Sequence, residues 1–436
     1  MTTPADTARI PDPALIESLF RIEGGRARAA VAAMTQSLDL AEEAVQEAFA
    51  DALRAWPRSG VPDRPGAWIT TAAKNRAIDK LRREAQRPER ERQSEVVAVS
   101  QVASHGPSGG VDEELQLLFT CCHPALSETA RIALSLRFVF GLSAREIARL
   151  FLEPEPTVAQ RLTRAKAKIR TARIPLRVPP PELFGERVPT VLSCLYLTFT
   201  EGYAPVAGDD AIRGDLCTEA IRLTQLVHGL VPEAGEVQSL LALFLFQHSR
   251  RDARLAFARD GADGIETRGG AVPLEEQDRC LWDRQMIDAG LTHLSAAAAH
   301  DRDTRGPYFY QAVIAGAHAV APTFAATAWT TIVAAYDRLA GLHDSPVVHL
   351  NRAIALGFRD GPDAGLRELA TLRDDKRLAR LPSFAVAQAD LLRRAARYPE
   401  AVRAYEEALS SVSNEAVCVL LRRRLREVQS AAQLLS

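Results

Sequence analysis

The sequence of 436 residues has few cysteines, few aromatic residues and no long apolar run. Its cysteines are scattered and do not have the spacing of a disulfide framework. No stretch approaches the ~18 consecutive apolar residues of a membrane-spanning helix, and the N-terminus lacks the apolar core of a signal peptide. These absences predict a cytoplasmic protein in a reducing compartment, with no membrane association.

The sequence also lacks the short motifs of common catalysts: it has no HExxH, no P-loop and no GxSxG. One cluster, TCCHP (120–124), invites a metal or redox site. Adjacent side chains on a helix diverge by about 100°, so Cys121, Cys122 and His123 cannot readily share a tetrahedral metal. We therefore predict no enzyme, no cofactor, no metal and no catalytic residue. The thiols should be buried at a helix end, with a redox-responsive thiol as the alternative.

Apolar residues recur every three to four positions almost throughout, which predicts an all-α protein. A chain of this length needs more than one core. Stretches rich in glycine, serine and proline, such as SHGPSGG (104–110) and PLRVPPPELFGERVP (175–189), mark the boundaries between parts. The predicted parts are a helical block at 13–92, a flexible linker at 93–111, a second block at 112–174, a helical extension at 187–300, and helical repeats at 301–436.

The repeat prediction depends on two similar segments, GPDAGLRELATL (361–372) and YPEAVRAYEEALS (398–410). Asp363 and Glu400 stand 37 positions apart, close to the period of about 34 residues in tetratricopeptide repeats. Unrelated amphipathic helices are the alternative. Stacked helical pairs form a concave surface, so we expect this part to bind a protein or a ligand.

The second block has the pattern of a helix-turn-helix in GLSAREIARLFLEPEPTVAQRLTRAKAKIR (141–170). Gly141 can end one helix, Ser143 and Glu146 form a capping box for the next, and Thr157 can cap a third. The third helix places apolar residues on one face and polar or basic residues on the other, so it either reads DNA or is a solvated basic helix. Gln160 and Arg164 suit base edges. The candidate DNA-binding residues are Thr157, Gln160, Arg161, Thr163, Arg164 and Lys168.

The first block contains an acidic helix followed by a basic one. DLAEEAVQEAFADALRAW (39–56) should bury one face, which consists of Ala41, Ala44, Val45, Ala48, Phe49 and Ala52. Its outer face is either simply solvated or binds a basic protein surface; the candidates are Asp39, Glu42, Glu43, Gln46 and Glu47. The helix at 67–87 suits a nucleic-acid backbone, and Trp68 either stacks on a base or lies in the core. Its candidates are Lys74, Asn75, Arg76, Lys80, Arg82 and Arg83.

This order of elements resembles the extracytoplasmic-function (ECF) group of bacterial RNA polymerase sigma factors. DLAEEAVQEAF (39–49) and AWITTAAKNRAIDKLRR (67–83) match the motifs of their second region, and 141–170 looks like their fourth region. Three further stretches are similar to a subgroup with a C-terminal, tetratricopeptide-like helical extension: FTCCHPALSETARIALSLRFVFGLS (119–143), LYLTFTEGYAP (195–205) and EEQDRCLWDRQMI (275–287).

The resemblance implies a transcription initiation factor that binds core RNA polymerase and directs it to promoters. The acidic helix would contact polymerase, helix 67–87 would hold the melted minus-10 element, and the third helix of the second block would read the minus-35 duplex. The extension would be a fused regulatory domain, with a DGPF/YCII-like small protein or another ligand as its partner. The main alternative is a helix-turn-helix regulator with a helical sensor domain that is not part of the polymerase holoenzyme. A third interpretation is an all-helical enzyme or scaffold, in which the basic helix has no DNA-binding role.

Overall fold

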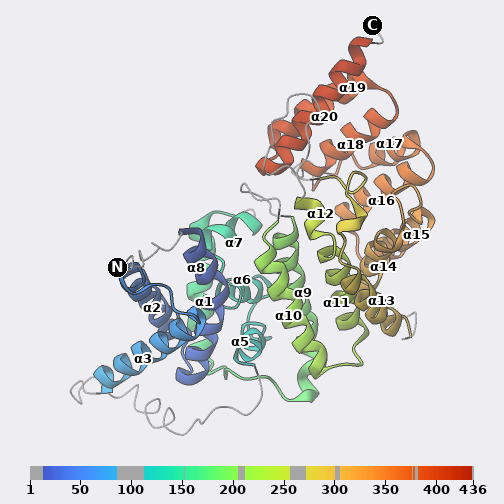
Figure 1. Cartoon of the computed structure of the whole chain (residues 1–436). Helices are drawn as coiled ribbons and strands as arrows, with labels where there is room; N and C mark the ends of the chain where they lie inside the picture. Colours follow the sequence, from blue (N-terminus) through green and yellow to red (C-terminus); the bar gives the residue numbers. More distant parts are fainter. Residues whose placement is uncertain are drawn as a thin grey trace, which may run out of the picture. The chain divides into compact units, whose positions relative to one another are not determined.

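The computed structural model describes residues 13–85, 112–204 except 152, 212–255, 272–299, 305–378 except 376, and 382–434. These residues form helices joined by turns, without a β-strand among them, as the apolar periodicity predicts (Figure 1). The chain divides into two compact units, residues 1–198 and 199–436. The boundary falls within one helix, α9 (Phe184–Tyr203). The predicted linker at 93–111 lies outside the described residues.

The first unit contains two groups of helices before α9 begins. Their bounds are α1 (Pro13–Thr35), α2 (Leu38–Ser59) and α3 (Pro65–Ala85) in the first group, and α5 (Glu113–Cys121), α6 (Glu128–Phe138), α7 (Ala144–Phe151) and α8 (Glu155–Thr171) in the second.

Local sequence explains the start, face and end of α2. The Ser37 hydroxyl accepts a hydrogen bond from the Leu40 amide and caps the helix. Gly60, with a φ of 78°, ends it. The predicted inner face is confirmed, since all its members are buried: Ala41, Ala44, Val45, Ala48, Phe49 and Ala52. Trp68 of α3 packs edge-on against the buried Trp56, with ring centroids 5.6 Å apart, which favours its interpretation as a core residue.

The second group has the predicted helix-turn-helix, with one correction. Gly141 has a φ of 72°, and the predicted capping box forms through two hydrogen bonds, Ser143 N to Glu146 Oε2 and Glu146 N to Ser143 Oγ. The prediction that Thr157 caps the third helix is wrong. That helix begins at Glu155, because Pro156 suits the first turn, and Thr157 lies inside it.

Helix α1 joins the two groups by close backbone packing. A Cβ atom on Gly25 would lie 2.3 Å from the carbonyl oxygen of Val139, at the end of α6, so only glycine permits this approach. Three residues along α1, the buried Arg28 donates from Nε to the carbonyl oxygen of Phe138 at 3.1 Å. Burial lowers the pKa of Arg28 to about 10.

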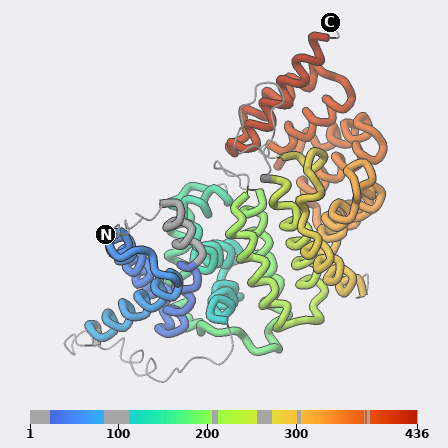
Figure 2. The backbone as a smooth tube through the Cα atoms, in the orientation of Figure 1, coloured from blue at the N-terminus to red at the C-terminus, as the bar shows by residue number. Residues whose placement is uncertain are grey.

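The second unit begins with the end of α9, and over residues 284–434 each helix packs on the next (Figure 2). Their bounds are α10 (Gly214–Leu230), α11 (Gly235–His248), α12 (Arg251–Leu255), η3 (Arg279–Leu281), α13 (Arg284–Ala298), α14 (Pro307–Val320), α15 (Trp329–Leu342), α16 (Pro346–Arg359), α17 (Pro362–Thr371), α18 (Pro382–Arg394), α19 (Tyr398–Ser411) and α20 (Glu415–Leu434).

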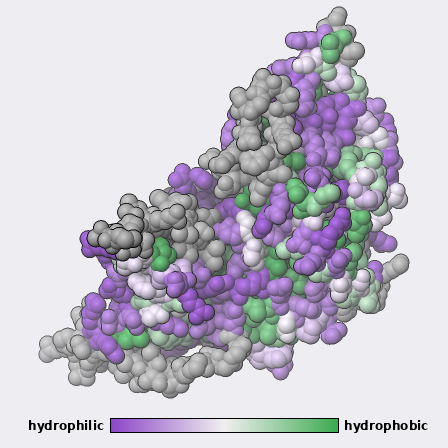
Figure 3. All heavy atoms as spheres, viewed as in Figure 1, coloured by the Kyte–Doolittle hydropathy of each residue, from purple (hydrophilic) through white to green (hydrophobic). Residues whose placement is uncertain are grey.

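The two segments with the repeat pattern each form a helix, α17 and α19. Ala404, Tyr405 and Ala408 of α19 are buried on one face, against α18 and α20. The tetratricopeptide assignment itself stays a prediction. Polar residues cover most of the face shown in Figure 3. Among the described residues, no helix is long and apolar enough to cross a bilayer.

Candidate functional site

The acidic face of α2 lies opposite its buried alanines. Asp39, Glu43, Gln46 and Glu47 are exposed, while the Glu42 side chain is only 20% exposed. The five residues predicted to bind a basic protein surface therefore share one helix face, but Glu42 lies at its edge, where it meets the second group of helices.

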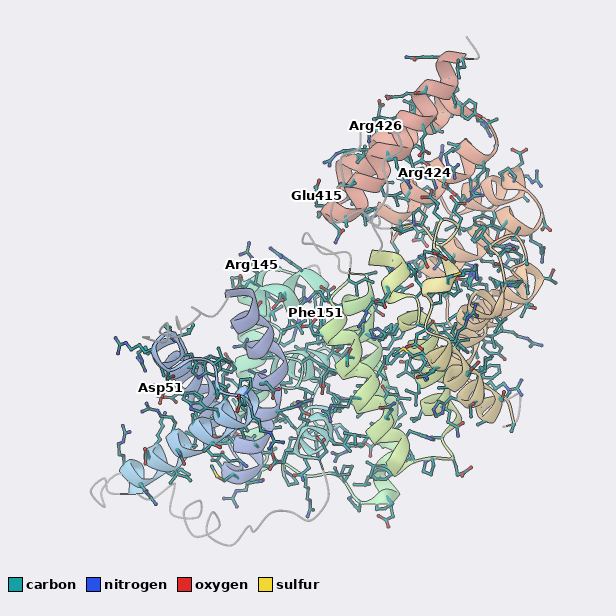
Figure 4. All side chains as sticks on the ribbon, viewed as in Figure 1. Asp51, Arg145, Phe151, Glu415, Arg424 and Arg426 are labelled. Carbon is teal, nitrogen blue, oxygen red and sulfur yellow. The ribbon has the colours of Figure 1, made fainter. Side chains whose placement is uncertain are left out.

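Helix α3 lies beside α2, and several of its cations are paired with the acidic helix. Arg76 Nη2 lies 2.6 Å from Asp51 Oδ2, and Lys80 forms an ion pair with Glu43. A hydrogen bond from Arg54, together with Arg76, outweighs burial and holds the pKa of Asp51 below its ordinary value. Asp51 projects from α2 in Figure 4. Asp51 is not among the predicted site residues, although its contact with Arg76 holds that side chain against α2.

The other candidate residues of α3 lack close partners on α2. Lys74 Nζ is 3.9 Å from Glu113 Oε1, a contact between the two helix groups. Asn75, Arg82 and Arg83 are exposed and form no hydrogen bond or ion pair with the described residues. The predicted DNA-binding residues of α3 therefore divide into a paired set beside α2 and an open set.

Helix α8 has the predicted division between its two faces. Val158, Leu162, Ala165 and Ile169 are buried. Five of the six predicted DNA-binding residues are exposed along the opposite side: Thr157, Gln160, Thr163, Arg164 and Lys168. The structure therefore brings these residues together on one open surface.

Arg161 is the exception among the six. Its Nη2 donates to Glu153 Oε1 at 2.9 Å, and its guanidinium lies over the ring of Phe151, 5.5 Å from the centroid. Phe151 ends α7, and Arg145, near the start of the same helix, is exposed (Figure 4). Arg161 thus ties α8 to the preceding turn, and its side chain is only 18% exposed.

The inner flank of α8 contacts the acidic helix. Lys166 Nζ lies 2.8 Å from Asp39 Oδ1 and 3.0 Å from Glu42 Oε2. Arg170 Nη1 lies 3.4 Å from Asp39 Oδ2, and Arg137 of α6 donates from Nη2 to Glu42 Oε1 at 2.7 Å. Arg137, Lys166 and Arg170 are not among the predicted site residues, and no local pattern in the sequence indicates these contacts. Two of the acidic candidates are instead paired with the second helix group.

These ion pairs shift the pKa values of both partners. Burial alone would raise the pKa of Glu42, but Arg137 and Lys166 outweigh it and lower that pKa. Burial likewise opposes the charge of Lys166, while hydrogen bonds to Asp39 and Glu42 hold its pKa above the ordinary value. Both groups are therefore charged near neutral pH and attract each other in a partly desolvated setting.

The thiols of TCCHP lie at the end of α5, as predicted, and both are buried. Cys122 Sγ lies 3.7 Å from Cys194 Sγ of α9 and 3.6 Å from Ser135 Oγ. Burial raises the pKa values of Cys121 and Cys122, which disfavours the reactive thiolates. Cys194 comes 72 residues later, and no spacing in the sequence indicates the contact. Within the described ranges, no group of three metal-ligating side chains is placed to hold an ion.

Comparison with known families matches three segments of the chain. Residues 19–87 match sigma-70 region 2, and residues 116–169 match sigma-70 region 4. Residues 187–298 match a family of unknown function, DUF6596. The first two matches cover the helices that carry the acidic face and the helix-turn-helix.

Two relatives illustrate the similarity. An uncharacterized protein of Rhizobium meliloti is 40% identical over 400 residues, which cover 89% of this chain and 90% of that protein. A Mycobacterium tuberculosis protein named "Probable ECF RNA polymerase sigma factor SigI" is 30% identical over 153 residues, 34% of this chain and 51% of that protein. The chain thus spans about half the length of the mycobacterial relative. No solved structure matched.

A regulator outside the polymerase holoenzyme would need the helix-turn-helix but not a region 2 before it. Here both regions occur in one chain, in the order of a sigma factor. The chain therefore belongs to the sigma-70 family of RNA polymerase sigma factors, in its ECF group, and carries a C-terminal helical extension that begins with the family of unknown function.

Proposed function

We propose that the acidic face of α2 binds core RNA polymerase. The observation that carries this proposal is the arrangement of Glu43, Gln46 and Glu47 on one exposed helix face, backed by a buried apolar face that fixes the helix in place. Asp39 and Glu42 extend this face toward α8. A row of carboxylates with one amide suits a basic protein surface and would repel DNA.

Promoter DNA is assigned to the two basic helices. The open set on α3, Asn75, Arg82 and Arg83, would track the melted minus-10 strand, joined by Lys74, Arg76 and Lys80. The exposed side of α8 would enter the major groove of the minus-35 duplex, with Gln160 and Arg164 at base edges. The protein makes and breaks no bond itself and acts in the cytoplasm, where polymerase supplies the chemistry.

Polymerase binding would compete with contacts inside the first unit. Asp39 and Glu42 are paired with Lys166, Arg170 and Arg137, so a polymerase surface that takes up these carboxylates must displace the second helix group. We infer that the free protein keeps its two DNA-reading groups together and that polymerase separates them. The linker at 93–111 would then allow α3 to reach the minus-10 element and α8 to reach the minus-35 element. Because the two helices belong to one chain, binding of one would raise the effective concentration of the other at its element.

Binding to purified core polymerase, followed by run-off transcription, tests the acidic face. Glu47→Arg reverses a charge on an exposed side chain whose nearest cation, Arg76 Nε, lies 4.0 Å away. We expect at least a tenfold loss of core affinity and a matching loss of transcripts. Glu407→Arg, on the exposed side of α19, is the matched control and should bind normally. Equal core affinity of the two variants would refute the assignment of α2.

The extension is proposed to regulate initiation by binding a ligand or a small protein of the DGPF/YCII-like type. Its role is best tested by a truncation after Tyr203 rather than earlier, because α9 packs within the first unit through Thr190 and Cys194. A truncated chain that transcribes more than the full chain would indicate restraint by the extension. A truncated chain that binds core but does not transcribe would indicate activation.

A further inference from the structure

The second unit contains three arginines that alternate with two aromatic rings. Arg254 Cζ lies 3.8 Å from the ring centroid of Tyr203, and Arg250 Cζ lies 6.0 Å from the same ring. Arg250 is also 5.7 Å from the ring of Trp282, whose other neighbour is Arg279 at 4.3 Å. Tyr203 ends α9, Arg250 lies in the turn between α11 and α12, Arg254 lies in α12, and the other two come from η3 and the residue that follows it. We call these five residues the arginine ladder.

Arg250 is the most enclosed cation of the ladder, at 8% exposed. Its Nη2 donates a hydrogen bond to the hydroxyl of Tyr203 at 2.6 Å. Burial and then Arg254 lower its pKa, and no carboxylate of the described residues acts on it. A buried guanidinium without an anionic partner costs several kcal/mol, so an arginine in this setting is normally paired.

Arg279 shares this lack of a carboxylate. Its Nη1 donates to the carbonyl oxygens of His318 and Ala321, at the C-terminal end of α14, where the helix dipole offers only partial negative charge. Burial, Arg250 and Arg284 all lower its pKa. Within the part of the chain that the structure describes, two neighbouring cations therefore lie together without a carboxylate between them.

Several hydrogen-bonding nitrogens in the same place have no partner among the described residues. They are Arg279 Nη2, Trp282 Nε1 and His318 Nδ1, all buried. The first two can only donate, and His318 Nδ1 donates in one tautomer. Buried donors that lack acceptors are costly and call for an explanation. An oxygen-rich anion would supply both the missing charge and the missing acceptors.

We propose that Arg250, Arg279 and Trp282 form the binding site of a small oxyanion, a phosphate or a carboxylate, within the C-terminal extension. Guanidinium forks match the oxygen geometry of both groups, and the indole N–H adds a single directed donor. Trp282 is 3% exposed, so only a small anionic group reaches it, after a shift of the flexible arginine side chains. This inference does not depend on the polymerase or promoter assignments.

The test uses the full chain with inorganic phosphate as the probe, and with citrate as the carboxylate arm, each against sodium chloride at equal ionic strength. Thermal unfolding and tryptophan fluorescence are followed together. We expect phosphate, citrate or both to raise Tm in a saturable way that chloride does not reproduce, with a change in emission that Trp282→Phe abolishes. A Tm increase with phosphate alone would identify a phosphate ligand, and an increase with citrate alone would identify a carboxylate ligand.

Arg250→Gln should weaken this binding at least tenfold. Trp282→Phe keeps an aromatic ring beside the arginines but removes the pyrrole part of the indole with its N–H, so it should weaken binding by several-fold. It is the second test of the site if Arg250→Gln fails to fold. Arg251→Gln is the matched control, because Arg251 is exposed and paired with Asp252. A Tm that responds no more to phosphate and citrate than to chloride would overturn the site. So would equal binding by the control and both ladder variants.

Discussion

Lys166 of the DNA-reading helix lies 3.0 Å from Glu42 of the acidic helix, although 124 residues separate them in the chain. The contact joins a helix assigned to promoter DNA with one assigned to polymerase. This conformation therefore covers Asp39 and Glu42 of the acidic face with α8, while the candidate DNA-binding side of α8 stays exposed.

Replacing Lys166 should favour the separated arrangement. Lys166→Gln removes the cation shared by Asp39 and Glu42, so we expect core polymerase to bind faster, by about fivefold, which corresponds to a coupling of about 1 kcal/mol. Stopped-flow association with core, without DNA, measures this. Lys168→Gln, on the exposed side of the same helix, should leave the rate unchanged. If both variants associate at the native rate, the α2–α8 contact does not restrain polymerase binding.

Arg164 should contribute sequence selectivity rather than general affinity. Its exposed position on α8 suits a bidentate contact to guanine, so Arg164→Ala should cost about 1–3 kcal/mol of discrimination at one minus-35 base pair. Fluorescence anisotropy of holoenzyme on matched and single-substituted duplexes provides the measurement. Arg367→Ala, exposed on α17, serves as the control. A variant that loses affinity equally for all duplexes would assign Arg164 to phosphate contact instead.

His318 should make the stability of the second unit depend on pH. Burial, with Arg250 and Arg279 nearby, lowers the pKa of His318 to about 4. The folded state thus keeps the imidazole neutral, whereas the unfolded chain protonates it near pH 6.5. The free energy of unfolding should therefore fall as pH decreases from 6.5 toward 4, by up to about 3 kcal/mol.

Denaturant titrations across this window, in buffers without phosphate or carboxylate, measure the effect. His318→Gln does not titrate and should flatten the dependence, apart from the contribution of the acidic residues that both proteins share. An unchanged slope in the variant would contradict the assignment to His318.

Ala396 is a position where glycine should stabilise the protein. Its φ of 57° lies in the left-handed region, at the turn between α18 and α19, where a side chain costs about 1–2 kcal/mol. Ala396→Gly should therefore raise the free energy of unfolding by about 1 kcal/mol. Ala334→Gly, exposed in the middle of α15, should lower it by about 0.5–1 kcal/mol. Destabilisation by both variants would argue against a left-handed Ala396.

The cysteines should differ sharply in reactivity. Cys280 is exposed, while Cys121, Cys122, Cys194, Cys217 and Cys418 are buried. A thiol reagent such as Ellman's should detect one fast-reacting group in the native protein, and Cys280→Ser should remove it. Rapid modification of Cys122 in that variant would revive the alternative of a redox-responsive thiol.

The elements that sequence analysis predicted well depend on local patterns. The buried faces of α2 and α8 follow from a spacing of three to four residues, and the capping box of Ser143 and Glu146 is complete within four positions. The start of α8 was misplaced at Thr157, since Pro156 serves the first turn as well as it breaks a helix.

Contacts between distant segments could not be predicted in the same way. A basic residue on a predicted DNA-reading helix is assigned to DNA unless tertiary packing turns it toward a carboxylate, as happens to Lys166. The contacts between Cys122 and Cys194 and between Arg250 and Trp282 likewise depend on how the helices pack. The spacing of apolar residues within one helix does not indicate such contacts.

The interface between the two helix groups contains a backbone contact at Gly25 as well as the ion pairs of Lys166. The ion pairs at Lys166 weaken as ionic strength rises, because mobile ions screen them. The contact of Gly25 with the Val139 carbonyl involves backbone shape and is indifferent to salt. The interface between the two helix groups thus has a salt-sensitive part, the ion pairs of Lys166, and a salt-insensitive part, the backbone contact of Gly25. A methyl group at position 25 would clash with the Val139 carbonyl, so the close packing of the two groups requires glycine there.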